Sequence, residues 1–178
     1  MYKHVADLLD SGEIVAIFQG RIEAGPRALG NRSLLYDPRR NDGERINNIK
    51  GREPWRPFAA SVMLEHARDW FDMATLKESP YMMYSIPVRD EVKDRIPIVV
   101  SADGTCRIQT VTKQQNYHYY NLIKAFYSKT GVPMVFNTSF NLAGEVIVHT
   151  LDHAIDMLSR CQIKYLYLPD KNELRCIS

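Results

Sequence analysis

The sequence predicts a single α/β (α+β) domain over residues 1–178, in which helices flank a twisted mixed β-sheet. Short apolar runs of strand length alternate with stretches whose apolar residues recur at helical spacing. The 178 residues suffice for one well-packed core. No internal repeat, low-complexity tract or linker is present to divide the chain, so one domain is expected.

The first half of the chain begins with a helix and a buried strand. Tyr2–Asp10 has its apolar residues on one helical face, and Gly12 provides a natural stop. Pro26 and Gly30 match the proline-first, glycine-last asymmetry of a short helix. The expected helices are Tyr2–Asp10, Pro26–Gly30, Asn41–Lys50 and Glu65–Phe71, and the expected strands are Ile14–Phe18, Ser33–Tyr36 and Phe58–Met63.

The second half begins with an irregular stretch. Met73–Pro97 has three prolines and no sustained period, which favours loops with one or two edge strands. Asp103-Gly104 between the apolar runs Ile98–Val100 and Cys106–Val111 predicts a β-hairpin. The later elements are a helix through Tyr119–Phe126 that stops near Gly131, a strand at Val132–Phe136, a helix over Leu151–Leu158 capped by Thr150, and a strand at Lys164–Leu168.

Positive charge is concentrated in one segment. The net charge of +2 gives no strong global field, so composition does not indicate wholesale binding of polyanions. Gly20–Arg56 nevertheless holds nine Lys or Arg against five Asp or Glu. The three cysteines form no CxxC pair, which argues against a disulfide framework or a cysteine zinc site. The N-terminus resembles neither a signal peptide nor a membrane anchor, so we expect a cytoplasmic protein with reduced thiols.

Gly20–Ser33 is the first candidate for a functional loop. It places Arg21, Arg27 and Arg32 among glycines, directly after an expected buried strand. Guanidinium groups bind phosphate or carboxylate oxygens in pairs, and glycines let the backbone approach a ligand. The stretch therefore fits an anion-binding loop and, equally well on its own residues, a surface turn with solvated arginines.

Ile49–Phe58 is the second candidate. It interleaves three cations with Trp55, and two prolines stiffen it. Lysine provides a compact charge for a phosphate oxygen, while arginine binds two oxygens or stacks on a ring. We favour a functional site here over a solvated basic turn, which would not need such stiffening.

Two further segments are weaker when taken alone. Arg107 and Gln109 lie two apart on an expected strand and would share one face, although a solvent-facing sheet edge explains them better. Asn137–Asn141 follows a buried strand, and ligands of open α/β sheets collect beyond the carboxyl ends of strands. An ordinary polar turn explains that composition nearly as well.

Several common functional patterns are missing from the sequence. The five histidines show no metal-ligand spacing, and no GxSxG, Walker A, HExxH or GxGxxG motif is present. The tyrosines of residues 117–127 fit a helix surface and core better than a base-stacking platform. We therefore expect no resident metal ion and no DNA partner, and RNA binding is the least favoured function.

Four segments in a fixed order are more specific than any one of them. They read GRIEAGPRALGNRS, IKGREPWRPFA, ADGTCRIQTV and TGVPMVFNTSFNLAGE. In this order they resemble the C-terminal half of the O-carbamoyltransferases that act on nodulation factors, cephalosporins and aminoglycosides. The resemblance extends from about Ile14 to Leu168. That half of the family is similar to YrdC, the threonylcarbamoyl-adenylate synthase fold, which implies a twisted mixed sheet around a positively charged concave site.

The resemblance also implies a reaction. Carbamoyl phosphate would be cleaved to carbamate, which attacks the α-phosphate of ATP to give carbamoyl-adenylate and pyrophosphate. Mg²⁺ would accompany ATP as the substrate complex. The implied catalytic residues are Lys50, Arg56 and Arg107, and the implied substrate- and nucleotide-binding residues are Arg27, Arg32, Asn137, Ser139 and Asn141. Several fixed cations would position the two anions and reduce their repulsion, so no side-chain nucleophile is needed.

The chain departs from the family pattern in three places. Ser101 and Ala102 stand where histidine is usual, and Val146 stands where proline is usual. Because Met1 lies just ahead of the adenylating half, we expect the N-terminal transferase half to be missing. Transfer to an acceptor hydroxyl would then need a separate transferase subunit. The alternative is a binding module without turnover that retains affinity for nucleotides or anions as a partner subunit.

Overall fold

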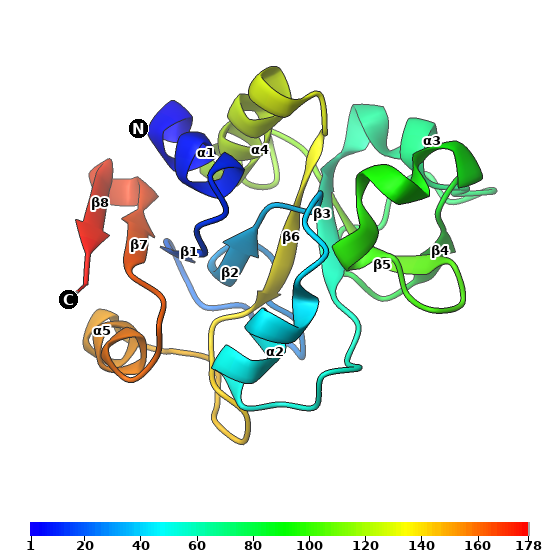
Figure 1. The fold of residues 1–178 in the computed structure, drawn as a ribbon. Coiled ribbons are helices and arrows are strands. Elements are labelled where there is room, and N and C mark those ends of the chain that lie inside the picture. Colours follow the sequence, from blue (N-terminus) through cyan, green and yellow to red (C-terminus); the bar gives the residue numbers. More distant parts are fainter. Residues whose placement is uncertain (178) are drawn as a thin grey trace.

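A computed structural model describes residues 1–177 (Figure 1). The strands of its sheet are β1 Val15–Phe18, β2 Arg32–Tyr36, β3 Ala59–Met63, β4 Ser85–Pro87, β5 Thr105–Val111, β6 Met134–Ser139, β7 Tyr165–Leu168 and β8 Glu173–Cys176. The α-helices are α1 Tyr2–Asp10, α2 Gly43–Lys50, α3 Ala67–Trp70, α4 Tyr117–Thr130 and α5 Leu151–Ser159. Short 3₁₀ turns occupy Leu64–His66, Asp90–Arg95, Pro97–Val99 and Pro169–Lys171.

The strands form one eight-stranded sheet in the order β4-β5-β3-β6-β2-β1-β7-β8. The pairs β1–β7 and β3–β5 are parallel, and the other neighbours are antiparallel. The predicted mixed sheet with flanking helices is therefore confirmed. None of the helices within residues 1–177 has the length and apolar character that crossing a bilayer requires.

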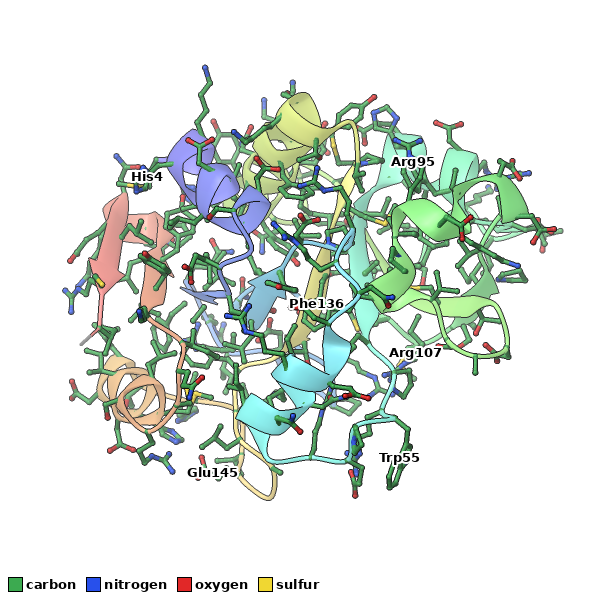
Figure 2. The ribbon with its side chains drawn as sticks, viewed as in Figure 1. His4, Trp55, Arg95, Arg107, Phe136 and Glu145 are labelled. Carbon is green, nitrogen blue, oxygen red and sulfur yellow. The ribbon has the colours of Figure 1, made fainter. Side chains whose placement is uncertain are left out.

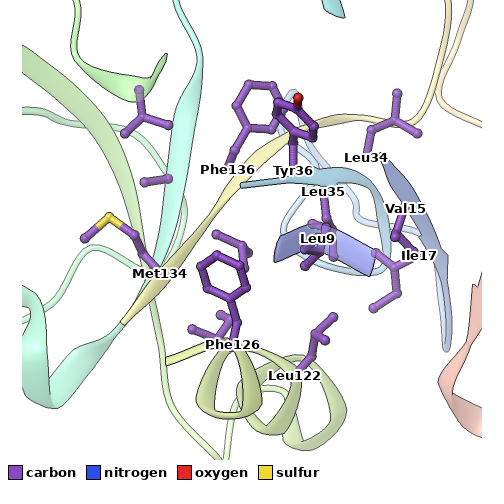
Figure 3. Close-up of a cluster of buried hydrophobic side chains, with 14 of the residues drawn as sticks. Leu9, Val15, Ile17, Leu34, Leu35, Tyr36, Leu122, Phe126, Met134 and Phe136 are labelled. Carbon is purple, nitrogen blue, oxygen red and sulfur yellow. The ribbon is translucent and has the colours of Figure 1, made fainter. Parts of the chain in front are cut away.

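The central strands are covered on both faces, which explains their nearly continuous apolar sequence. Helices α1 and α4 pack together, and Figure 3 shows Leu122 and Phe126 of α4 on one side of the sheet. Tyr36 and Phe136 lie on the other side (Figure 3). The Tyr36 hydroxyl donates to Asp42, which precedes α2, at 2.9 Å, and α2 therefore covers that face.

Helix ends follow the predicted capping chemistry. The Thr150 hydroxyl accepts a hydrogen bond from the His153 amide at the start of α5. Gly131 ends α4 in the left-handed conformation, with φ of +72°. Such positive φ values carry little cost for glycine, so these stops are encoded locally.

The short helix predicted between Pro26 and Gly30 does not form. Residues 19–31 contain neither helix nor strand. Instead, the Glu23 carboxylate accepts hydrogen bonds from the amides of Leu29 at 2.7 Å and Asn31 at 2.8 Å. A side chain thus satisfies backbone donors that a helix would have paired internally, and sequence spacing alone did not reveal this competition.

The predicted hairpin was also wrong in its first strand. The turn itself exists, because the Gly104 amide donates to the Ser101 oxygen at 2.8 Å. However, Pro97–Val99 forms a 3₁₀ turn, and β5 pairs with β4 and β3 instead. Pro97 lacks the amide donor of a sheet ladder, and Ile98 and Val99 reach the core from the turn.

Smaller differences concern element ends. The strand predicted to stop at Phe136 continues to Ser139, because Asn137, Thr138 and Ser139 pair with β2. The helix predicted at Glu65–Phe71 divides into a 3₁₀ turn and the four-residue α3. The short edge strand β4 confirms the edge strand expected within Met73–Pro97, whereas the short edge strand β8 was not predicted.

Candidate anion-binding site

Two adjoining cavities open at the end of the sheet where β6 ends and β3 and β5 begin. The lysine cavity, of about 470 Å³, is lined by Lys50, Arg52, Arg56, Ser139 and Asn141 among others. The arginine cavity, of about 90 Å³, is lined by residues that include Arg27, Arg52, Arg107, Asn137 and Ser139. Figure 2 shows Arg107, Trp55 and Glu145 at this end of the molecule, below Phe136.

Arg27, Arg52 and Arg107 reach the arginine cavity from three separate segments. Within residues 1–177, none of these guanidinium groups has a carboxylate partner. Burial lowers the pKa of Arg107, and nearby Arg27 lowers it further. Arginine remains charged despite such shifts, so the cavity is lined by uncompensated positive charge.

Arg52 is the residue that the sequence-based assignment missed. It lines both cavities, and its guanidinium lies over the Phe58 ring at 4.6 Å. Burial, followed by the charges of Arg56 and Arg107, lowers its pKa to about 10. Its position between Lys50 and Arg56 in the proline-stiffened segment was the available signal, but spacing did not show which cation faces inward.

Lys50 is almost fully buried, with 3% of its surface exposed. Its Nζ donates to the backbone oxygens of Ser139 at 2.5 Å and Asn141 at 2.8 Å, and to the side-chain Oδ1 of Asn141 at 3.2 Å. Burial, reinforced by Arg52, lowers the pKa of Lys50 to about 7. In this geometry the ammonium group holds the end of β6 in place from the wall of the lysine cavity.

Ser139 and Asn141 line the same cavity beside Lys50. Ser139 Oγ donates to Asn141 Oδ1 at 2.5 Å, and Asn141 Nδ2 donates to the Glu145 oxygen at 2.8 Å. The Glu145 carboxylate pairs with Arg160 at 2.7 Å. The predicted residues Lys50, Ser139 and Asn141 are therefore brought together into one hydrogen-bonded unit.

Arg56 and Arg32 differ from the arginines of the cluster. Arg56 is exposed at the mouth of the lysine cavity and pairs with Glu53 at 2.7 Å. Arg32 is 4% exposed, and its Nη1 donates to the Gln19 oxygen at 2.6 Å. Its guanidinium stacks 3.5 Å from the Phe18 ring centre. The structure thus places Arg32 behind the loop, apart from the residues that line the two cavities.

Asn137 lies at the arginine cavity, but its amide donor is already hydrogen-bonded within the protein. Its Nδ2 donates to the Ala28 oxygen at 3.1 Å and to Ser61 Oγ at 2.9 Å. Its Oδ1 is buried without a partner among the described residues. Across residues 1–177, no group of three or more His, Cys, Asp or Glu side chains is arranged to hold a metal ion.

Comparison with protein-family models assigns most of the chain to one family. Residues 6–172 match the family described as carbamoyltransferase C-terminus. The chain is 44% identical over 153 residues to nodulation protein NolNO of Sinorhizobium fredii. The aligned segment covers 84% of this chain. The match takes in 22% of NolNO, so the chain spans about a fifth of that relative's length.

Solved structures of low sequence identity share the fold. Full-length HypF in the phosphate- and nucleotide-bound form superposes with a TM-score of 0.62 at 18% identity, over 90% of this chain and 20% of HypF. P. abyssi Sua5 complexed with L-threonine gives a TM-score of 0.60 at 11% identity, over 87% of this chain and 43% of Sua5. The predicted YrdC-like fold is therefore confirmed.

Proposed function

Because this chain belongs to the carbamoyltransferase C-terminus family, we propose that it performs the adenylating half of a carbamoyl transfer. Water first cleaves carbamoyl phosphate to carbamate and phosphate. A carbamate oxygen then attacks the α-phosphorus of ATP. The bond from that phosphorus to the oxygen bridging the β-phosphate breaks, and the products are carbamoyl-adenylate and pyrophosphate.

The observation that carries this proposal is the convergence of Arg27, Arg52 and Arg107 on one cavity, where none of them pairs with a carboxylate of residues 1–177. Both proposed substrates are polyanions, and a carbamate that approaches a phosphate is repelled by its charge. Fixed guanidinium groups in a partly desolvated cavity offset this repulsion and hold the reactants in register. A surface turn with solvated arginines would not place three partly buried cations together.

The neighbouring lysine cavity supplies the second part of the proposed site. At about 470 Å³ it is the larger cavity, and Lys50, Ser139 and Asn141 give it a polar wall. The shared residues Arg52 and Ser139 would contact ligands in both cavities. The fold is also that of HypF, which was captured in a phosphate- and nucleotide-bound form.

Magnesium enters this proposal with the nucleotide. The carboxylates nearest the lysine cavity, Glu53 and Glu145, are paired with Arg56 and Arg160. The donors lining the cavities suit phosphate oxygens better than a cation. Mg²⁺ would therefore be held by the ATP phosphates as the substrate complex, where it neutralises part of their charge.

The acceptor step would lie with another domain or subunit. The match covers 22% of NolNO, so most of that relative has no counterpart in the 178 residues. We propose that carbamoyl-adenylate passes to a separate transferase, which carbamoylates an acceptor hydroxyl.

Exchange of labelled pyrophosphate into ATP tests the reaction. With Mg²⁺ and carbamoyl phosphate present, the protein should catalyse exchange, and omitting carbamoyl phosphate should abolish it. Arg107→Ala should lower the rate by about 10–100-fold, because a lost charge-assisted hydrogen bond costs about 1.5–3 kcal/mol. The matched control is Arg175→Ala, which removes an arginine paired with Glu173 on β8.

The other outcomes identify other functions. A folded protein that binds ATP by calorimetry but shows no exchange is a nucleotide-binding partner module, which would refute turnover by this chain alone. RNA affinity that falls steeply with salt, without exchange, would point instead to RNA binding at the same cations.

A further inference from the structure

Charged and neutral side chains hold different parts of the loop between β1 and β2. Glu23 accepts from the Leu29 and Asn31 amides, and Arg32 donates to the Gln19 and Asn31 backbone oxygens. Three consecutive backbone oxygens of this loop each accept a hydrogen bond from a buried amide. The bonds join Asn137 Nδ2 to the Ala28 oxygen at 3.1 Å, Gln109 Nε2 to the Leu29 oxygen at 2.9 Å, and Gln19 Nε2 to the Gly30 oxygen at 2.7 Å.

These three amides come from different segments. Gln109 and Asn137 are linked through Ser61, while Gln19 also donates to Asn116 Oδ1 at 3.2 Å. Gln19 follows β1, Gln109 lies in β5 and Asn137 lies in β6, and they are 4%, 6% and 2% exposed. Ser61 Oγ donates to Gln109 Oε1 at 2.7 Å and accepts from Asn137 Nδ2 at 2.9 Å. Asn137 Oδ1 has no partner among the described residues, but the three amide donors are paired. A buried network of this kind has few alternative arrangements, so it holds the loop above it.

Arg27 directly precedes the first of the three held oxygens. Its Nε is buried without a hydrogen-bond partner in the described part of the chain, so no direct side-chain bond restrains that nitrogen. The position of its guanidinium therefore depends on how firmly the backbone at Ala28–Gly30 is held. That backbone rests on the amides alone at its oxygen side.

The second cationic loop is held in the same way. Asn47, which is fully buried in α2, donates its Nδ2 to the Pro54 oxygen at 2.8 Å. Its Oδ1 accepts from Arg52 Nε at 2.5 Å. An amide thus supports Arg52 as well, from an element unrelated to the other three.

The absence of charge on these donors has a physical reason. A backbone oxygen needs a donor, which can be an amide, a hydroxyl, a lysine or an arginine. A buried cation beside Arg27, Arg52 and Arg107 would add to their mutual repulsion and to the cost of desolvation. An amide supplies the same hydrogen bond without adding a positive charge. The positive potential of the cavity then remains available to a ligand.

We propose that Gln19, Gln109 and Asn137 form an uncharged amide clamp that positions Arg27 toward Arg52 and Arg107 and thereby sets the anion affinity of the arginine cavity. The clamp residues are positioning residues. The inference rests on the anion binding of the proposed function, and it assigns to Asn137 a role in holding the loop.

Gln109→Glu is the sharpest test, because Gln109 is not among the residues lining the cavity. The carboxylate keeps the acceptor for Ser61, loses the donor to Leu29 and adds a negative charge below the arginines. Once protonated, the carboxyl group can donate to Leu29 again. Sulfate is the probe, because its charge stays constant from about pH 5 to pH 8, and each affinity is compared with that of the parent at the same pH.

We expect Gln109→Glu to bind sulfate at least tenfold more weakly than the parent at pH 8. The ratio should return toward one at low pH, as the carboxyl group regains its proton. Asn121→Asp is the matched control, because Asn121 Nδ2 donates to the Tyr117 oxygen on α4, away from the cavities. It should bind sulfate like the parent at every pH.

Other results would overturn the inference. A folded Gln109→Glu protein that binds sulfate like the parent at pH 8, or whose loss persists unchanged at low pH, contradicts the clamp. If that variant does not fold, Gln109→Met decides, since it lacks both donor and charge: a pH-independent loss of affinity supports the clamp and unchanged affinity refutes it. A parent protein that binds neither sulfate nor pyrophosphate refutes the proposed anion site itself.

Discussion

Two walls of the cavities are held in opposite ways. In the loop at residues 20–31, which carries Arg27, the backbone oxygens of residues 28–30 accept hydrogen bonds from neutral amides. The loop at residues 139–145 is held by the Lys50 ammonium, which donates to Ser139 and Asn141. The first support has no titratable group, while the second titrates near neutral pH, since the pKa of Lys50 is lowered to about 7.

The positive charge of the arginine cavity therefore stays constant with pH, whereas that of the lysine cavity changes with pH. Around the arginine cavity the guanidinium groups keep their charge at every physiological pH. In the lysine cavity, loss of one proton from Lys50 removes a positive charge and one hydrogen-bond donor at the same time. We therefore expect the two walls to respond differently to substitution and to pH.

At constant pH, the largest loss of stability should come from Gly30→Ala, which disrupts the amide-held wall. Gly30 has φ of +100°, and a Cβ there would lie 2.2 Å from the Tyr119 ring, which is fully buried. The combined clash and backbone strain should cost about 3–4 kcal/mol of unfolding free energy, measured by denaturant titration.

Gly20→Ala is the control for this prediction within the same loop. Gly20 also has a positive φ, of +48°, but nothing lies within 4 Å of a Cβ at that position. It should cost only about 1 kcal/mol. Equal losses in the two variants would show that the contact with Tyr119 does not define this wall.

The next effect is a pH dependence that belongs to the lysine-held wall alone. As the pH rises from about 6 to about 8.5, Lys50 loses its proton, and the parent's affinity for sulfate should fall several-fold. Lys50→Met should bind sulfate weakly, with little change over this range. An equally steep profile in Lys50→Met would assign the titration to another group.

Whereas the affinity for sulfate should fall as the pH rises, the free energy of unfolding should increase. Because the pKa of Lys50 is lowered from 10.5 to about 7 on folding, the unfolded chain binds more protons between these values. The stability of the parent relative to Lys50→Met should therefore rise across this window, by up to about 5 kcal/mol. Denaturant titrations of both proteins at the two ends of the window measure this.

The smallest effect should come from Glu53→Gln. Glu53 pairs with Arg56 at 2.7 Å on the exposed rim of the lysine cavity. Exposed pairs contribute little to stability, so denaturant titration should show no change. Freeing the Arg56 charge should tighten pyrophosphate binding about twofold at low salt, with the gain lost at high salt. A tenfold gain in pyrophosphate affinity would mean that Arg56, like Arg52, contributes its charge directly to the anion site.

Much of the fold could be predicted because its signals are local. The apolar face of α1, the N-cap at Thr150 and the glycine stop at Gly131 depend on residues within a few positions of each other. The errors at Pro26–Gly30 and at Ile98–Val100 arose where a distant strand or a side chain took the backbone partner that a local pattern would have used.

The candidate site was predicted in part. Lys50, Ser139 and Asn141 do converge, and Arg27 and Arg107 share a cavity. Asn137 lines the arginine cavity and Arg32 lies apart from both cavities, and the donors of both side chains bond other groups of the chain. Arg52 was missed because its inward direction depends on Asn47 and Phe58.

The sequence by itself determined the family, the order of the elements and which segments carry cations. Only the tertiary structure decided which cations are compensated, pairing Arg56 with Glu53 and leaving Arg107 without a carboxylate among the described residues. The reason is that such contacts join distant positions, as Gln109 and Leu29 do across 80 residues. Residue identity fixes the charge of a side chain, while its partner depends on how the strands are brought together.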